Sequence, residues 1–244
     1  MTDEDPFRHH PELRGQIADP MASSFRHFSL EVMAEIAAAR GLPTGWWYSD
    51  AEREAIRRRD LCGQTGDLWV FAYGSLMWDP ALRFDDLRRA FLPDHARRFI
   101  LKDTYGARGT AAAPGLMAAL DLGPGCEGLA FRIPRPLVED ETRILWQRER
   151  IGPAYRAEFL DARTASGPLR VLAFLADHDA AQIEAELPRD EQVRCLATGE
   201  GFLGTSLDYI RGIETRLACL GIEDPDVTAL RRDAEACAAR LSGT

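Results

Sequence analysis

Two short stretches of this sequence bring together residues suited to binding and proton transfer. The first, Tyr73-Gly74-Ser75-Leu76, continues an apolar run that begins at Leu68, and the second is Arg148-Glu149-Arg150. The β-branched and aromatic residues of the apolar run predict a strand. Because glycine permits backbone angles that other residues avoid, the strand can end in a loop whose N–H groups form an anion-binding nest. An ordinary turn after the strand is the alternative interpretation.

Glu149 is the candidate general base and acid. We expect it at the C-terminal end of a helix, where the negative end of the helix dipole raises the pKa of a carboxyl group. Partial burial would raise that pKa further. A carboxylate of this kind can accept a proton and return it near neutral pH. The alternative is a surface glutamate in a charge ladder with Arg148 and Arg150.

Three further side chains are candidates for substrate binding, and each also has a purely structural interpretation. Tyr73 and Tyr209 can offer hydroxyl groups to a cleft, or can be core tyrosines with satisfied hydroxyls. Arg108 stands in the flexible stretch Gly106-Ala107-Arg108-Gly109 and can grip a carboxylate or be a plain loop residue. A nucleophilic Ser75 is disfavoured, because the second glycine of G-x-S-x-G is missing and no histidine follows at a suitable spacing.

The elements that must position these residues are mostly strands, followed by helices. We expect a hairpin turn at Gly123-Pro124-Gly125 and a helix that begins near Pro136 and ends at about 147–150. Runs of strands and then of helices favour an α+β fold with a small mixed sheet or barrel. A Rossmann fold is disfavoured because no GxGxxG follows a strand, and there is no P-loop. The expected strands are 68–73, 97–101, 115–120, 126–133, 155–162 and 169–176, and the later helices are 192–198, one capped by Thr205 and one opened by Asp224-Pro225.

The first 67 residues read as a helical N-terminal extension, and we place a domain boundary at Leu68, with the main domain over 68–244. Residues 1–28 hold three prolines and predict a loose arm. Ser29 and Ser49 can each cap a short helix, the second through a capping box with Glu52. The aromatic stretch 45–48 between these helices predicts a plug that ties the arm to the body, with a ligand platform as the alternative.

Composition narrows the class of protein. The chain has 244 residues, 45% hydrophobic and 28% charged residues and a net charge of -9, as expected of a globular protein without affinity for nucleic acid. The five cysteines and five histidines show no metal-ligand spacing, so we expect no metal and free thiols in a cytoplasmic protein. No apolar segment is long enough to span a membrane, and the N-terminus has no secretory pattern.

Several motifs, in this order, resemble the ChaC-like γ-glutamylcyclotransferases over about 68–230. They are Trp69 through Trp78, then Arg108-Gly109-Thr110 and Pro114-Gly115, then Arg148-Glu149 with Tyr155, and Gly204 through Ile210. The resemblance implies a lyase that needs no cofactor and converts glutathione to 5-oxoproline and cysteinylglycine, on a small β-barrel with flanking helices.

The resemblance also implies roles for individual residues. It places the acid and base on Glu149, the substrate loop on Tyr73, Gly74, Ser75 and Leu76, and a tyrosine near the substrate on Tyr209. The sequence departs from the family pattern on either side of Arg108-Gly109-Thr110, where Ala107 and Ala111 stand in place of the frequent His and Pro. These two departures bear on substrate recognition.

The implied reaction suits these residue types. A γ-glutamyl group carries its own nucleophile, the α-amine, and holding the bent conformer can give effective molarities of about 10⁵ M or more. One carboxylate can move both protons, and loop amides can stabilise the developing oxyanion. Two alternatives remain: a non-catalytic module that binds a γ-glutamyl compound or a protein partner, and a cyclotransferase for another γ-glutamyl amine.

Overall fold

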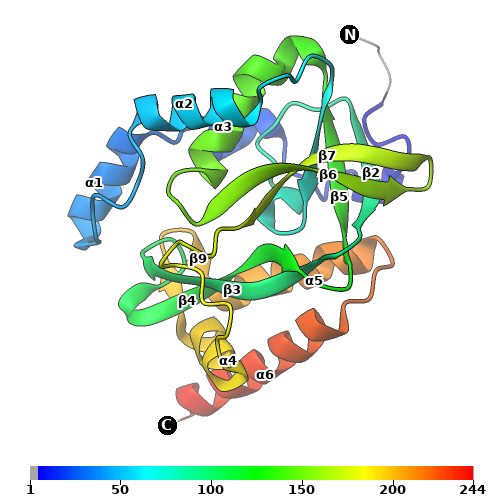
Figure 1. Cartoon of the computed structure of the whole chain (residues 1–244). Coiled ribbons are helices and arrows are strands. Elements are labelled where there is room, and N and C mark those ends of the chain that lie inside the picture. Colours follow the sequence, from blue (N-terminus) through cyan, green and yellow to red (C-terminus); the bar gives the residue numbers. More distant parts are fainter. Residues whose placement is uncertain (1–4, 244) are drawn as a thin grey trace.

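A computed structural model describes residues 5–243 (Figure 1). Its centre is a seven-stranded sheet in the order β1-β5-β2-β6-β7-β4-β3, in which β1 also pairs with β7. That extra pairing closes β1, β5, β2, β6 and β7 into a barrel, and the β4–β3 ribbon extends from it through a parallel bridge between Leu120 and Leu175. The strands are β1 Leu68–Ala72, β2 Asp86–Leu92, β3 His95–Tyr105, β4 Thr110–Leu122, β5 Cys126–Ile133, β6 Tyr155–Thr164 and β7 Gly167–Ala176.

Helices cover the barrel and its ribbon from two sides. In Figure 1, α1, α2 and α3 lie on one side of the β6–β7 hairpin, and α4, α5 and α6 lie beyond the β3–β4 ribbon on the other. The mixed α+β architecture with a small barrel and flanking helices is therefore confirmed. The helices are α1 Leu30–Arg40, α2 Asp50–Asp60, α3 Val138–Glu149, α4 Arg189–Thr198, α5 Ser206–Cys219 and α6 Pro225–Ser242. A short two-stranded ribbon, β8 Glu200–Gly201 and β9 Gly204–Thr205, precedes α5.

The helix starts agree with the capping residues in the sequence. Ser49 and Glu52 form the full capping box at α2, and Ser29 accepts a hydrogen bond from Val32 N–H at α1. Thr205 and Asp224 accept from the third residue of α5 and α6 in the same way. Each cap satisfies a backbone donor that has no partner within the helix, so these starts follow from local chemistry alone.

The expected hairpin between β4 and β5 is wrong. These strands follow each other in sequence but do not pair: β4 pairs with β3 and β7, whereas β5 pairs with β1 and β2. The turn at Gly123-Pro124-Gly125 thus carries the chain from the ribbon to the barrel. Strand β2 was missed because its sequence, Asp-Leu-Arg-Arg-Ala-Phe-Leu, mixes charged residues with the apolar ones that it buries.

The N-terminal arm is not loose over its described part, residues 5–28. Leu13 is fully buried and Ile17 nearly so, both within the main core cluster. Ala18 N–H donates to the Trp78 carbonyl at 2.8 Å, and Arg26 pairs with the buried carboxylate of Glu141. The arm is polar and rich in proline, but it packs on the body because a few buried apolar residues anchor it.

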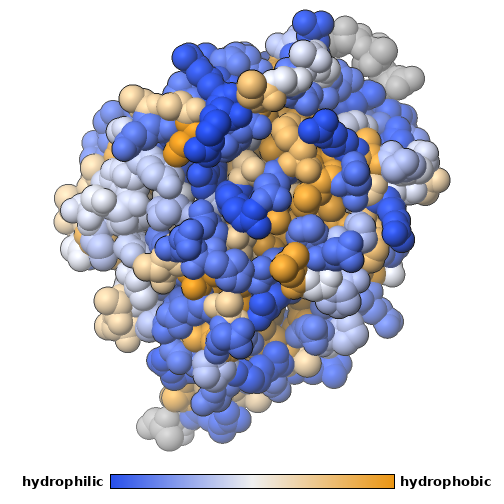
Figure 2. All heavy atoms as spheres, viewed as in Figure 1, coloured by the Kyte–Doolittle hydropathy of each residue, from blue (hydrophilic) through white to orange (hydrophobic). Residues whose placement is uncertain are grey.

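Hydrophilic side chains cover most of the face in Figure 2, and apolar side chains show between them near its centre. Every helix over residues 5–243 is too short or too polar to cross a bilayer.

Candidate active site

A pocket of about 330 Å³ lies where the end of α3, the turn after β1, strand β3 and the start of α5 meet. Four of the residues proposed from the sequence line it together: Ser75, Arg108, Glu149 and Tyr209. The other three, Tyr73, Gly74 and Leu76, do not line it. Polar residues that were not predicted for the site also line this pocket, and they are Asp79, Asp103, Arg148, Tyr155 and Gln182.

Glu149 is the last residue of α3, and its side chain is only 14% exposed. The structure thus excludes a surface charge ladder for this residue. Burial raises the pKa of Glu149 above its ordinary value, and the neighbouring Arg148 cation acts in the opposite direction. Arg148 Nε lies 3.0 Å from Glu149 Oε1. A buried carboxyl group with a raised pKa can accept a proton and return it near neutral pH.

Arg148 ties Glu149 to the turn after β1. Its Nη2 donates to Ser75 Oγ at 2.7 Å, its Nη1 donates to the Asp79 carbonyl, and its guanidinium lies 4.0 Å from the centre of the Phe25 ring. One side chain thus fixes the end of α3 against the Ser75 turn. The sequence signal for it was its place beside Glu149, but its contacts with Ser75 and Asp79 span 73 and 69 residues.

The turn after β1 presents unpaired backbone donors. Within residues 5–243, the N–H groups of Gly74, Ser75 and Leu76 reach no protein acceptor, whereas those of Met77 and Trp78 bond back to the carbonyls of Gly74 and Ser75. Three successive free N–H groups at the start of a short helical turn suit a carboxylate or an oxyanion. This geometry agrees with the nest interpretation.

The structure explains the glycine at position 74 differently from the sequence analysis. Its φ is -129°, outside the positive range that favours glycine, so the unusual φ expected from the sequence does not explain the glycine. A Cβ at this position would instead lie 2.8 Å from Tyr209 Oη. The glycine lets the turn approach Tyr209 closely.

We expect Gly74→Ala to lower kcat/KM of the cyclisation that the sequence resemblance implies by about 10²-fold. The methyl group would push the turn away from Tyr209 and misplace the N–H groups of the turn. The same overlap costs roughly 1–3 kcal/mol of folding stability. Adding Tyr209→Phe removes the atom that the methyl group meets, so the double variant should regain most of the lost melting temperature. Thermal melts that show simple addition of the two single effects would contradict this explanation.

Three tyrosines lie close enough to Glu149 to feel its charge; Tyr73 and Tyr209 are buried, and Tyr155 is partly buried. Tyr73 donates its hydroxyl to the Phe174 carbonyl at 2.8 Å, Tyr155 donates to the Ala118 carbonyl at 3.0 Å, and Tyr209 accepts from Ala118 N–H at 3.4 Å. Burial raises the pKa of each phenol, so all three stay neutral at working pH. Tyr73 is thus a satisfied core residue, whereas Tyr155 and Tyr209 reach the pocket.

Arg108 is a partly buried cation that lines the pocket. Its guanidinium lies 4.8 Å from the centre of the Tyr209 ring and donates to the Thr205 carbonyl at 3.1 Å. Among residues 5–243, no acidic side chain lies within ion-pair distance of it. Burial lowers the pKa of Arg108, so an anion that enters the pocket would relieve this cost.

The backbone around Arg108 is fixed by close contacts. Asp103 accepts hydrogen bonds from Tyr105 N–H at 2.8 Å and Gly109 N–H at 3.0 Å, and also from Arg108 N–H. A Cβ on Gly109 would overlap the backbone of Gly115. The Arg-Gly-Thr and Pro-Gly motifs therefore meet in space and hold Arg108 over the pocket.

Gln182 is a candidate that the sequence did not reveal. Its carbonyl accepts from Lys102 N–H at 2.9 Å, which pins this segment to β3. The residue is 7% exposed, yet its side-chain amide has no hydrogen bond within the described residues, and it faces the pocket. Its amide atoms are not fully enclosed by protein, so they can form hydrogen bonds with a ligand in the pocket. Its local sequence, Ala-Ala-Gln-Ile, has no recognisable signal.

No group of three or more His, Cys, Asp or Glu side chains over residues 5–243 is arranged to hold a metal ion. The pocket offers carboxylate, guanidinium, phenol and amide groups instead. These groups can bind charged ends of a small molecule and move protons.

Comparisons with known proteins indicate one protein family. A family model described as ChaC-like protein matches residues 68–236. A "Glutathione-specific gamma-glutamylcyclotransferase" from Escherichia coli (strain K12) is 35% identical over 170 residues, which cover 68% of this chain and 71% of that protein. "Glutathione-specific gamma-glutamylcyclotransferase 1" from Rattus norvegicus is 29% identical over 153 residues, which cover 61% of this chain and 68% of that one.

A solved structure shares the fold. It is a selenomethionine-labelled γ-glutamyl cyclotransferase specific to glutathione from yeast, with a TM-score of 0.64 and 21% sequence identity. The alignment covers 70% of this chain and 96% of the yeast protein.

Proposed function

This chain belongs to the ChaC-like protein family, and on that premise we propose that it is a glutathione-specific γ-glutamylcyclotransferase. One observation carries the proposal: the buried carboxylate of Glu149 shares a pocket with the unpaired cation of Arg108 and the free N–H groups of the turn at Ser75. A γ-glutamyl head presents a carboxylate, an ammonium group and a carbonyl oxygen, and this set of groups can serve all three.

The proposed reaction proceeds through one acid–base residue. Glu149 takes a proton from the α-ammonium group, and the resulting amine attacks the γ-carbonyl carbon, whose oxygen becomes an oxyanion. The new C–N bond closes a five-membered ring, and Glu149 passes this first proton to the leaving nitrogen. Glu149 then takes the second proton from the ring nitrogen, the carbonyl re-forms as the bond to the leaving nitrogen breaks, and the second proton goes to the released amine, which departs as an ammonium group. The products are 5-oxoproline and cysteinylglycine, so atoms and charge balance without a further reactant.

The remaining site residues bind and position. We assign the α-carboxylate of the substrate to Arg108 and the developing oxyanion to the N–H groups of the turn 74–76. The substrate loop Tyr73–Leu76 thus acts through its backbone, since the side chains of Tyr73 and Leu76 are buried. The Tyr209 ring packs against the Arg108 guanidinium and holds it in place. The side-chain amide of Gln182 is free to bind the peptide portion of the donor.

A second candidate is a cyclotransferase for another γ-glutamyl amine. The observation that favours it is Ala107, which lines the pocket at a position where the resemblance leads us to expect histidine. A methyl group there leaves space and removes a hydrogen-bonding group. The leaving amine of the donor would therefore be recognised differently.

We also propose the division into an extension over 1–67 and a catalytic domain over 68–244, with action in the cytoplasm on a small molecule and without nucleic acid. The net charge of -9 supports the last point. The match of the family model from residue 68 supports the division.

The test is to incubate the purified chain with glutathione, without added metal or nucleotide, and to measure both products by mass spectrometry. We expect equal amounts of 5-oxoproline and cysteinylglycine. γ-Glutamylcysteine and γ-glutamylalanine run in parallel would identify the second candidate, if they turn over faster. Tight binding of glutathione, with no 5-oxoproline formed from any of the three donors, would contradict both and favour a binding module.

A further inference from the structure

The pocket has a wall that does not come from the part of the chain matched by the family model. Phe25, Phe28, Met33 and Trp46 line it, and all four precede residue 68. We propose that these four residues, here called the N-terminal wall, contact the side chain of the donor's second residue and make the enzyme prefer an uncharged, sulfur-containing one. The proposal rests on the proposed function and adds the subsite for the leaving amine.

The first half of the wall is fixed to the body next to Glu149. The Phe25 ring lies under the guanidinium of Arg148, and the Phe28 carbonyl accepts a hydrogen bond from Gln147 Nε2. Between them, Arg26 donates to the Ala81 carbonyl at 2.8 Å and pairs with Glu141. The last two residues of α3 before Glu149 therefore hold Phe25 and Phe28 at the pocket.

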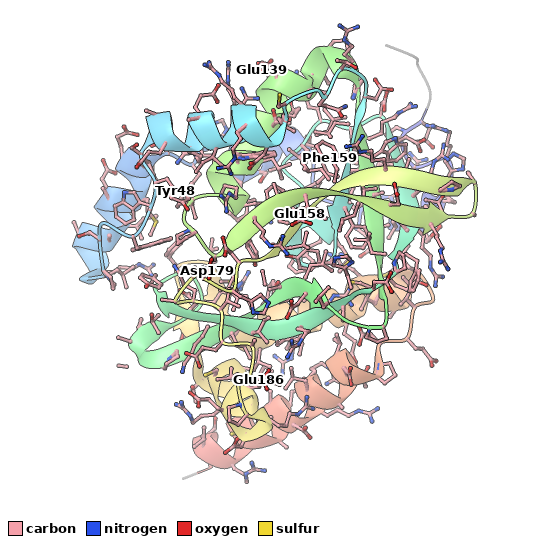
Figure 3. All side chains as sticks on the ribbon, in the orientation of Figure 1. Tyr48, Glu139, Glu158, Phe159, Asp179 and Glu186 are labelled. Atoms are coloured by element: carbon pink, nitrogen blue, oxygen red, sulfur yellow. The ribbon has the colours of Figure 1, made fainter. Side chains whose placement is uncertain are left out.

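The second half of the wall is fixed by Trp46. Its ring centre lies 4.9 Å from that of Tyr105, and a Cβ on Gly152 would come within 3.1 Å of Trp46 Cε3. The next contact along the chain is Tyr48 N–H, which donates to the Ile151 carbonyl at 2.9 Å. Figure 3 shows Tyr48 beneath α2, on the side of the molecule where the loop after α3 runs. Trp46 thus both ties the extension to the body, as the sequence predicted, and forms part of a ligand surface.

The chemistry of the wall indicates which end of the donor it contacts. Its only polar group is the indole N–H of Trp46, which already donates to the Pro43 carbonyl at 3.2 Å. Every charged side chain of the pocket comes from residues 75–209. A charged γ-glutamyl head placed against the wall would lose its hydration without compensation, so the head lies on the body.

The remainder of the donor therefore faces the wall. In glutathione that remainder begins with a cysteine, whose thiol is weakly polar and makes favourable contacts with aromatic rings. Three aromatic rings and a methionine offer such contacts. A charged second residue would meet the same unfavourable environment as the γ-glutamyl head, so donors of that kind should be rejected.

The test compares Trp46→Ala with Trp47→Ala, its neighbour, which is also partly buried but does not line the pocket. The donors are glutathione, γ-glutamyl-alanyl-glycine and γ-glutamyl-glycyl-glycine. We expect the wild type to prefer glutathione over the glycyl donor by about tenfold or more in kcat/KM. Trp46→Ala should remove most of that preference, mainly through KM, whereas Trp47→Ala should keep it.

Dissociation constants of the same donors, measured by calorimetry in the Glu149→Gln background, decide the question even without turnover. A preference that Trp46→Ala leaves unchanged, or an equal loss for all three donors, would overturn the proposal. A wild type that binds glutathione but forms no 5-oxoproline would overturn the proposed function instead, and the ratio of dissociation constants would still test the wall.

Discussion

We expect Glu149→Gln to lower kcat by about 10²–10⁴-fold, the range that general acid–base catalysis supplies. The amide keeps the size of the carboxylate but cannot take a proton from the ammonium group of the donor. Because Arg148 can still donate to the amide oxygen, we expect KM to change little. Initial rates of 5-oxoproline formation at saturating glutathione measure the effect.

The same variant should not be less stable than the wild type at neutral pH. Burial raises the pKa of Glu149, which means that folding disfavours its ionised form. The penalty is therefore present at a pH above the raised pKa and disappears as the pH falls below the ordinary value. Thermal melts should show Glu149→Gln equal to or above the wild type at pH 8, with the difference gone in acid.

A matched control lies on the same helix. Asp140 in α3 is 65% exposed and does not line the pocket. Asp140→Asn makes the same chemical change and should leave kcat at the wild-type value. Full activity in Glu149→Gln, or a comparable loss in Asp140→Asn, would remove Glu149 from its proposed role.

The parts of the fold set by local chemistry could be predicted. The side chains of Ser49 and Asp224 each place a hydrogen-bond acceptor where the backbone N–H groups of a helix start need one, and both helices begin there. The pairing of strands could not be predicted in the same way. The Gly123-Pro124-Gly125 turn has the composition of a hairpin, but which strands pair depends on how the barrel closes, a long-range property.

The residues of the candidate site also fall into those that the sequence could identify and those that it could not. Glu149, Arg108, Ser75 and Tyr209 stood out because motifs or helix position marked them, and they meet at one pocket. Gln182 did not, because what distinguishes it is an amide left without a partner after folding. Nor did the sequence show that a ring from the arm would lie under the arginine that positions Glu149. Such features exist only once distant segments have packed.

Substitution of Arg148 is the second change for which we expect a large loss of kcat/KM. Arg148→Met keeps much of the buried length of the side chain but loses the hydrogen bonds to Ser75 and Asp79 and the contact with Glu149. Both the turn and the carboxylate then lose their mutual alignment, and misplacement by about 1 Å can cost 10²-fold. We expect kcat/KM to fall by about that factor.

The pH profile separates a positioning role from a general loss of structure. The acid limb of kcat/KM reports the protonation of the catalytic carboxylate in the free enzyme. Since the Arg148 cation lowers the pKa of Glu149, removing that cation raises the pKa and moves the acid limb of Arg148→Met to higher pH. Arg148→Lys restores a charge but not the planar set of donors, so it should return the limb toward its wild-type position while most of the rate loss remains. An acid limb that stays in place in Arg148→Met would show that Arg148 does not act through Glu149, and the loss of rate would then belong to the turn at Ser75 alone.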